Sequence, residues 1–301
     1  MSSQKKIDFL SFDNMSAADI LGLLDLATRQ KADPNIYRHA RLLDGRVVGL
    51  IFEKASFRTR LSFETATYQL GGHPIYMGNE RIGERESIID LAKVASRYLD
   101  VFVLRTFKHE TIVEMAKHAS KPVINGLSDL HHPCQALGDL LTIKEKLGRL
   151  EGVKIAFIGD CNNICRSLAQ SVTKIGGRLS IACPHGFGFT PAFVKSTGIT
   201  LLTDPLEAIK DADVVYTDVW TSMGQENEAA KRRTIFQPYQ VNQELLNKVP
   251  NAIVMHDLPA HRGDEITDGV IDGPQSVVYD QAENRLHVQR ALLCRLIDRT
   301  L

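Results

Sequence analysis

The sequence predicts an α/β protein of two domains, each a parallel-sheet α/β layer structure, joined by interdomain helices. Two series of apolar, strand-like runs alternate with amphipathic stretches of helical period, and a long helical stretch lies between the two series. The runs are continuous in Val, Ile and Leu, which is typical of parallel strands covered on both faces. A length of 301 residues also fits two domains, since one domain takes about 150 residues.

The predicted elements follow one another in a regular order. A helix is expected over residues 16–29, where Ser16 has the side chain of an N-cap. The strands of the first series are expected at 46–54, 73–77, 101–106 and 122–127, and its helices over 86–99 and from about residues 59 and 110. After a helix over 132–148, the strands of the second series are expected at 154–160, 178–184, 199–203, 213–220 and 252–259.

A last amphipathic helix, over 282–299, is long enough to cross back to the first domain. The domain boundary is expected inside the helix over 132–148. The predicted domains are therefore residues 1–140 with the helix at 282–301, and residues 141–281. Ligands of open parallel sheets bind beyond the carboxyl ends of the strands, so the residues that follow the strands are the candidates for function.

Composition and charge exclude several classes of protein. Lys plus Arg and Asp plus Glu number 36 each, so no net charge attracts nucleic acid or an anionic membrane surface. No apolar run approaches the roughly 18 residues of a membrane span, and the first residues lack the apolar core of a secretory signal. The five cysteines show no CxxC spacing, which favours reduced thiols over a disulfide set or a zinc site. We therefore expect a cytoplasmic protein without a metal site.

The first candidate site is the segment Ser56-Phe57-Arg58-Thr59-Arg60, between an expected strand and an expected helix. A helix N-terminus offers unpaired backbone N–H groups and a partial positive charge, which together favour an anion. Two arginines and two hydroxyls at the same place add donors suited to phosphate oxygens. The segment predicts a phosphate-binding turn, and the alternative is an ordinary N-cap followed by solvated arginines.

Two further segments follow strands of the same expected sheet. His132-Pro133-Cys134-Gln135 opens the long helix. A proline at the helix start leaves the imidazole and the amide about one turn apart, so that both can face one small polar group. The alternative is a capped helix with an exposed histidine. Arg105 ends an expected strand, either as a ligand contact or as part of a structural ion pair.

Together these motifs resemble the carbamoyl-phosphate half of the aspartate/ornithine carbamoyltransferase family. The resemblance implies that the turn forms a phosphate cradle and that the other two segments polarise the carbamoyl carbonyl. The implied carbamoyl-phosphate-binding residues are Ser56, Phe57, Arg58, Thr59, Arg60, Arg81, Arg105, His132, Gln135 and Arg285. Prearranged donors suit this chemistry, because attack on a carbonyl develops negative charge on its oxygen.

Two of these residues depart from the family pattern. Phe57 stands where the family more often has threonine, and its backbone N–H is the group expected to matter. Arg81 stands where glutamine is usual, in a loop that in the family reaches the neighbouring subunit's site. The added charge of Arg81 is expected to help phosphate binding and to slow phosphate release.

The second series carries polar segments at corresponding places. Gly159-Asp160-Cys161-Asn162-Asn163 follows a strand but lacks the GxGxxG spacing, which argues against an NAD-dependent dehydrogenase. Its adjacent amides either bind a carboxylate or are ordinary turn residues. Asp218-Val219-Trp220-Thr221-Ser222-Met223-Gly224 ends another strand and offers a carboxylate for an ammonium group with a hydroxyl nearby. On composition alone this second segment is a loop.

The DVWxSMG pattern is similar to the ornithine-specific branch of the family. It implies that the loop at 222–224 closes over ornithine, which excludes water and strengthens the charge interactions inside. The family's HCLP motif is matched by His256-Asp257-Leu258-Pro259. The implied ornithine-binding residues are Asn163, Asp218, Ser222 and Met223, at the α-amino and α-carboxyl groups, together with Asp257 and Leu258.

Asp257 replaces the usual cysteine of this motif, beside the attacking δ-amine. A carboxylate there favours the charged ammonium, because opposite charges stabilise each other. Three roles remain open for it. Asp257 strengthens binding of the diamine while moving the rate optimum to higher pH, relays a proton from the amine, or pairs with His256 or His261.

The resemblance covers essentially the whole chain. It implies transfer of the carbamoyl group from carbamoyl phosphate to the δ-amine of L-ornithine, giving L-citrulline and phosphate without a cofactor. It also implies a homotrimer or higher homo-oligomer and a place in arginine metabolism, in the synthetic or the degradative direction. The alternatives are a carbamoyltransferase for another amine, such as putrescine or a modified ornithine, and a non-catalytic paralogue that binds carbamoyl phosphate or an amino acid. The implied catalytic residues are Arg58, Arg105, His132, Gln135 and Asp257.

Overall fold

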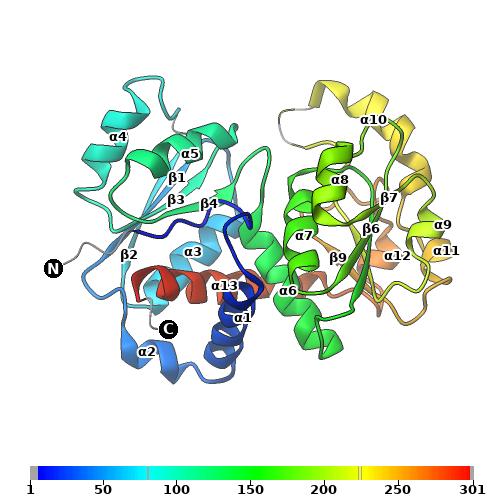
Figure 1. Cartoon of the computed structure of the whole chain (residues 1–301), viewed down its shortest axis with the longest axis horizontal. Helices are drawn as coiled ribbons and strands as arrows, with labels where there is room; N and C mark the ends of the chain where they lie inside the picture. Colours follow the sequence, from blue (N-terminus) through cyan, green and yellow to red (C-terminus); the bar gives the residue numbers. More distant parts are fainter. Residues whose placement is uncertain (1–5, 80, 223, 225, 299–301) are drawn as a thin grey trace. The chain divides into compact units, whose positions relative to one another are not determined.

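The chain divides into two compact units (Figure 1). The computed structural model describes residues 6–79, 81–222, 224 and 226–298. Unit 1 comprises Met1–Gly138 and Glu283–Leu301, and unit 2 comprises Asp139–Ala282. Both divisions fall inside helices, because α6 (Pro133–Leu147) and α13 (Val278–Ile297) each contribute residues to both units. Each unit contains one parallel sheet, so the predicted α/β class with two sheets is confirmed.

Unit 1 holds a four-stranded parallel sheet in the order β2-β1-β3-β4. Helices α4 and α5 pack on one face of this sheet, and α3 lies on the other (Figure 1). The chain proceeds from β1 to β2 on one side and returns to β3 on the other, so the carboxyl ends of β1 and β3 form the switch point where ligands of such sheets bind. The strands are β1 (Val47–Phe52), β2 (His73–Gly78), β3 (Val101–Arg105) and β4 (Val123–Leu127). The helices are α1 (Ala17–Ala32), α2 (Asn35–Ala40), α3 (Arg58–Gln69), α4 (Ile88–Ala95) and α5 (His109–His118).

Local sequence explains where several of these elements lie. The Ser16 hydroxyl accepts a hydrogen bond from the Asp19 N–H at 3.1 Å, and the Asp19 carboxylate accepts one from the Ser16 N–H at 3.0 Å. This reciprocal pair is a capping box, and it confirms the predicted N-cap of α1. Every residue of β3 and β4 is buried, as expected for parallel strands between two layers of helices.

Gly49, in the middle of β1, lies against the buried side chain of Leu99. A Cβ at Gly49 would lie 2.3 Å from Leu99 Cδ1. We expect Gly49→Ala to lower the free energy of unfolding by about 1–3 kcal/mol, because a packed leucine must move. Gly22→Ala is the matched control, since Gly22 lies inside α1 and a Cβ there meets no atom within 4 Å. This control should raise the free energy of unfolding by about 0.5–1 kcal/mol. Urea denaturation measures both variants. An equal loss of unfolding free energy in the two would contradict this account of β1 packing.

Unit 2 holds a five-stranded parallel sheet in the order β7-β6-β5-β8-β9, whose switch point lies between β5 and β8. Helices α9, α11 and α12 share one hydrophobic core with residues of β5, β8 and β9. The strands are β5 (Lys154–Ile158), β6 (Arg178–Ala182), β7 (Thr200–Leu202), β8 (Val214–Thr217) and β9 (Ile253–His256). The helices are α7 (Asn163–Lys174), α8 (Pro191–Thr197), α9 (Pro205–Ala208), α10 (Ala229–Phe236), α11 (Gln243–Leu246) and α12 (Asp268–Ile271), with 3-10 turns η1 (Glu226–Glu228) and η2 (Gln237–Tyr239).

All five strands of unit 2 end before their predicted limits, and three of them matter for the site. β5, β8 and β9 end at Ile158, Thr217 and His256, whereas the apolar runs predicted strands to residues 160, 220 and 259. Asp218 and Asp257 therefore lie at the carboxyl edge of the sheet and not within its strands.

Two expectations for the whole chain can be compared with the structure. All five cysteines are free thiols, as expected, and four of them are buried. Over the described residues, no helix combines the length and the apolar character that crossing a membrane requires.

Candidate active site

The carboxyl edge of the unit 1 sheet gathers basic side chains around one histidine. Arg58 begins α3, Arg105 ends β3, and His132 directly precedes α6. Arg285 comes from α13, close to the carboxyl end of the chain. Four separate segments thus contribute to one group.

His132 is the point on which the three arginine charges act. The residue is 2% exposed. Burial, followed by the charges of Arg285, Arg105 and Arg58, holds the pKa of His132 well below its usual value. The imidazole is therefore neutral at neutral pH, so it can donate one N–H without adding charge. This burial contradicts the alternative of an exposed histidine at a capped helix.

The N-terminus of α3 is not closed by a side chain. Its N-cap is Phe57, which makes no side-chain cap hydrogen bond and whose side chain is 75% exposed. The Ser56 hydroxyl accepts a hydrogen bond from Arg105 Nη1 at 3.3 Å and does not cap the helix. The serine cap of the alternative is therefore absent, whereas the exposure of Arg60 agrees with its solvated arginines. Arg105 thus contacts the residue two positions before α3, and a helix N-terminus without a side-chain cap suits an anion.

Arg285 connects two of the predicted motifs. This buried arginine donates to Gln135 Oε1 and, at 3.0 Å, to Thr59 Oγ1. The two bonds fix the orientation of the Gln135 amide and of the Thr59 hydroxyl. The structure thus brings together Ser56, Arg58, Thr59, Arg105, His132, Gln135 and Arg285.

Two predicted residues have other partners. Arg60 is exposed, and its Nε donates to Glu64 at 2.9 Å while its guanidinium lies 3.8 Å from the centroid of the Tyr76 ring. Arg81 is exposed and pairs with Glu84 at 3.5 Å. The structure does not bring either side chain into the group around His132.

The carboxyl edge of the unit 2 sheet is acidic. Asp218 follows β8, is 7% exposed, and its Oδ2 accepts a hydrogen bond from the Asn162 amide at 2.6 Å. Burial and the negative charge of Asp257 raise the pKa of Asp218 to about 7. Asn162 also caps α7, since its Oδ1 accepts from the Cys165 N–H at 3.1 Å. The amide that contacts Asp218 is therefore Asn162, which sequence reasoning passed over in favour of Asn163, although an asparagine before a helix is an N-cap signal.

His256, the last residue of β9, has a defined tautomer. Its Nδ1 accepts the N–H of Leu258 at 2.8 Å, so the ring proton lies on Nε2, which is 3.0 Å from Glu265 Oε1. Leu258 has a φ of 61°, in the left-handed region that a leucine rarely adopts. Both nitrogens of His256 are thus engaged. Of the pairing partners proposed for Asp257, His261 remains.

Arg232 anchors the loop that follows β8. It is buried, its Nε donates to the Trp220 carbonyl oxygen at 2.5 Å, and its guanidinium pairs with Asp160. Sequence reasoning missed Arg232, because no local pattern indicates a partner 72 residues away. Ser222 lies half-buried in the same loop, and Met223 lies outside the described residues.

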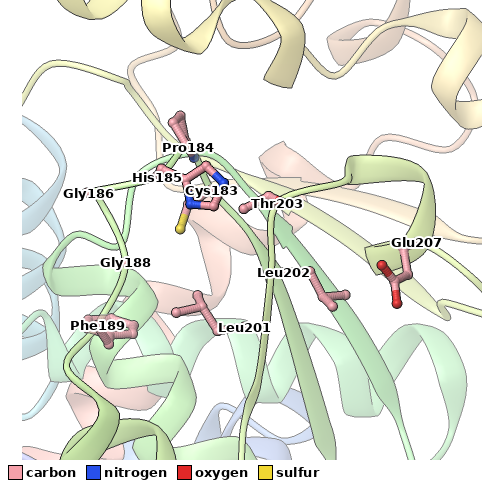
Figure 2. Close-up of a pocket in the computed structure, with 10 residues that line it drawn as sticks. All are labelled: Cys183, Pro184, His185, Gly186, Gly188, Phe189, Leu201, Leu202, Thr203 and Glu207. Carbon is pink, nitrogen blue, oxygen red and sulfur yellow. The ribbon is translucent and has the colours of Figure 1, made fainter.

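A separate cavity of about 510 Å³ opens at the carboxyl ends of β6 and β7 (Figure 2). Its lining includes Cys183, His185 and Glu207, and none of the predicted site residues is among the described residues that line it. Over the described part of the chain, no group of three or more His, Cys, Asp or Glu side chains is placed to hold a metal ion. The acidic edge at Asp218 is thus distinct from this cavity.

We expect the ligand-free protein to gain stability from Asp218 as the pH falls from 7 to 5. The pKa of Asp218 is about 7 in the folded protein and 3.8 is its ordinary value, so below pH 7 the folded state holds a proton that the unfolded state lacks. The gain rises by up to about 1.4 kcal/mol per pH unit and is absent above pH 7. Urea denaturation of wild type and Asp218→Asn over this range measures it. The same pH dependence in both proteins would contradict the assignment.

Both halves of the chain match domains of one known protein family. Residues 7–145 match the carbamoyl-P binding domain of aspartate/ornithine carbamoyltransferases, and residues 151–296 match their Asp/Orn binding domain. The ornithine carbamoyltransferase of Thermococcus kodakarensis is 48% identical over 298 residues, which is 95% of each chain. That of Bacillus subtilis is 47% identical over 95% of this chain and 92% of its own.

Solved structures of ornithine carbamoyltransferases are also similar to this chain. Ornithine carbamoyltransferase from Pyrococcus furiosus shares 46% identity with a TM-score of 0.92 over 98% of both chains. The enzyme from Thermus thermophilus shares 42% identity with a TM-score of 0.90, over 97% of this chain and 99% of its own. The chain therefore belongs to the aspartate/ornithine carbamoyltransferase family.

Proposed function

We propose that this chain transfers the carbamoyl group of carbamoyl phosphate to the δ-amine of L-ornithine, giving L-citrulline and phosphate. The observation that carries the proposal is the convergence of three arginine charges on a buried, neutral His132, beside a helix N-terminus without a side-chain cap. Arginines and backbone N–H groups suit the phosphoryl oxygens, and a neutral imidazole suits an uncharged carbonyl oxygen. The names of the relatives support the choice of ornithine as acceptor.

The reaction needs a neutral nitrogen and a polarised carbonyl. The δ-nitrogen of ornithine attacks the carbonyl carbon, and the negative charge that develops on the carbonyl oxygen is stabilised by His132 and Arg105. Each such donor is typically worth about 3–4 kcal/mol in the transition state. The bond from carbon to the bridging oxygen then breaks, and the leaving phosphate accepts the proton that nitrogen loses. Alignment of the two reactants supplies much of the remaining rate.

The acidic side chains at the carboxyl edge of the unit 2 sheet favour an acceptor that is an amino acid with a second amine. We assign Asp218 to the α-ammonium group of ornithine. The Asn162 amide holds the side chain of Asp218 in place. Asn163 and the loop with Ser222 and Met223 are assigned to the α-carboxylate. Asp257 and Leu258 are assigned to the δ-amine.

The assembly and the compartment are part of the same proposal. We infer a homotrimer or higher homo-oligomer, in which the exposed turn with Arg81 reaches the carbamoyl phosphate of a neighbouring subunit. The five free thiols support a reducing compartment such as the cytoplasm.

An assay of product from a panel of amines tests the reaction. Purified protein is mixed with carbamoyl phosphate and L-ornithine, putrescine or Nα-acetyl-L-ornithine between pH 6 and 10. We expect citrulline and phosphate in equal amounts, with ornithine at least about 100-fold faster than the other amines, because these lack a group that unit 2 would bind. A faster reaction with another amine would move the assignment to that acceptor. No carbamoylated product from any amine would leave a non-catalytic binding protein.

A further inference from the structure

A hydrogen-bonded turn separates β4 from His132. β4 ends at Leu127, and His132 directly precedes α6. The Ser128 N–H donates to the carbonyl oxygen of His131 at 2.9 Å, and the Ser128 hydroxyl accepts the N–H of His131 at 3.2 Å. Serine side chains often close turns by such bonds to the nearby backbone. Residues 128–131 therefore form one closed unit immediately before His132.

His132 is fixed on its other side by α6. The ring of Pro133 restricts the backbone of the preceding residue to extended conformations. The His132 carbonyl oxygen accepts the N–H groups of Gln135 at 3.1 Å and Ala136 at 3.2 Å, so this residue also begins the hydrogen bonding of the helix. The turn at 128–131 holds the side that remains, and its geometry therefore determines where the imidazole lies.

The hydroxyl of Ser128 is the centre of this turn. Ser128 is fully buried. Its Oγ lies 2.9 Å from Nδ1 of His109, at the start of α5, and accepts a hydrogen bond from the Asn125 amide of β4 at 3.4 Å. The Asn125 amide also donates to the Leu10 carbonyl oxygen at 2.9 Å. One hydroxyl thus joins the turn to a strand and to a helix.

His109 adds two further contacts to the same turn. Its backbone N–H donates to Asp129 Oδ1 at 2.8 Å. Its ring lies edge-on to the ring of His131, with the centroids 4.8 Å apart. Three consecutive elements, β4, the turn and α5, are therefore connected around Ser128, although sequence analysis singles out neither Ser128 nor His109.

We propose that Ser128 is a positioning residue, whose hydroxyl holds the turn before α6 so that the imidazole of His132 meets the carbonyl group of the bound donor. Arg58, Arg105 and Arg285 come from α3, β3 and α13, so they keep their places when the turn loosens. Loss of the hydroxyl should therefore weaken the contact with the carbonyl group and spare the contacts with the phosphoryl group. The proposal rests on the proposed use of carbamoyl phosphate.

Two phosphonates distinguish these contacts without turnover. Phosphonoacetamide has CH₂ in place of the bridging oxygen of carbamoyl phosphate and keeps the carbonyl group, whereas methylphosphonate has no carbonyl group. Calorimetric titration gives the affinity for each. In Ser128→Ala, phosphonoacetamide should bind about three- to tenfold more weakly than in wild type, the usual cost of one hydrogen bond. Methylphosphonate should bind within about twofold of wild type.

Turnover of Ser128→Ala gives a second measurement. We expect kcat for citrulline formation to fall at least about tenfold, because a displaced imidazole stabilises less of the charge that develops on the carbonyl oxygen. The KM for ornithine should stay within about threefold of wild type. A variant that is merely less stable would bind fewer ligand molecules per chain, and each occupied site would keep the wild-type kcat.

Ser96→Ala is the matched control. Ser96 is a buried serine of unit 1 at the end of α4. Its hydroxyl donates to the Ala92 carbonyl oxygen at 2.6 Å and accepts the Ser120 N–H at 3.0 Å. The change removes a buried hydroxyl with similar bonds and no printed contact to the turn. It should lower the melting temperature, with the ratio of the two affinities and kcat as in wild type.

His109→Phe is a second variant, which also serves if Ser128→Ala fails to fold. It keeps an aromatic ring beside His131 and removes the Nδ1 contact with Ser128. The ratio of the two affinities should change in the same direction as in Ser128→Ala. The double variant should show no further change, because His109 acts through the Ser128 hydroxyl.

An equal loss of affinity for the two phosphonates in Ser128→Ala would overturn the proposal, and so would an unchanged ratio. Citrulline formation by wild type tests the proposed function separately. A wild type that forms no citrulline, with the expected ratio change in Ser128→Ala, would keep the role of Ser128 and lose the proposed reaction. Normal citrulline formation by both proteins would keep the reaction and lose the role of Ser128.

Discussion

Arg58→Ala should lower kcat/KM for citrulline formation by about 100- to 1,000-fold, the usual cost of removing one donor from a charge-stabilising site. Arg58 begins α3, and its charge acts on the buried ring of His132 together with those of Arg105 and Arg285. The phosphoryl group of the donor substrate needs these charges both for binding and as a leaving group. The side chain is half-buried, so its removal leaves the core of unit 1 intact.

Arg97→Ala is the control for this change. Arg97 is exposed, in the same unit, and its loss removes the same charge. Steady-state kinetics should show Arg97→Ala within about twofold of wild type, and both variants should melt within a few degrees of it. Near-normal kcat/KM in Arg58→Ala would refute the role of the turn as a phosphate site.

Arg285→Met should lower both stability and activity. The side chain is buried and donates to Gln135 and Thr59, so its removal leaves two buried acceptors without their donor. Each such group costs about 1–3 kcal/mol, so the two together predict a loss of about 2–6 kcal/mol. The Gln135 amide and the N-terminal turn of α3 also lose their support, so kcat should fall by at least about tenfold in the folded protein.

Arg290→Met is the control that separates the loss of stability from the loss of activity. Arg290 is equally buried on the same helix, but it donates to Gln30 and Gln69 and lies 3.8 Å from the centroid of the Tyr37 ring. We expect a similar loss of stability from thermal denaturation, with kcat close to wild type in protein that remains folded. If Arg290→Met lost as much activity as Arg285→Met, the effect would come from α13 as a whole and not from the contacts with Gln135 and Thr59.

The fold was predictable where elements are long or strongly apolar. The capping box at Ser16 and the apolar strands carry their signals within a few consecutive residues. The four-residue helices α9, α11 and α12 show no apolar period, because a single turn is too short for one. They are held by the shared hydrophobic core of unit 2, which forms only after distant segments meet.

The candidate site of unit 1 was predictable because its motifs are contiguous. The segment around Arg58 and the segment around His132 each combine a helix start with donors for one ligand. Arg60 shows the limit of this reasoning. It belongs to the same motif, yet the helical period turns it toward Glu64, one turn along α3.

The contacts of unit 2 were less predictable, because they join residues far apart in the chain. Asn162 reaches Asp218 across two neighbouring strands, and Arg232 reaches Asp160 from α10. Glu265 holds His256 from a loop beyond β9. Such pairs depend on strand order and register, which sequence periodicity does not specify.

The central claim is that the arginines around His132 bind the phosphorylated substrate. Calorimetric titration with phosphonoacetamide, an unreactive analogue of carbamoyl phosphate with CH₂ in place of the bridging oxygen, tests this claim most directly. We expect wild type and Arg97→Ala to bind one molecule per chain, with an affinity that falls as salt is added, because the contacts are between opposite charges. Arg58→Ala should bind at least about tenfold more weakly. Equal binding by wild type and Arg58→Ala, or binding that is unaffected by salt, would contradict the claim.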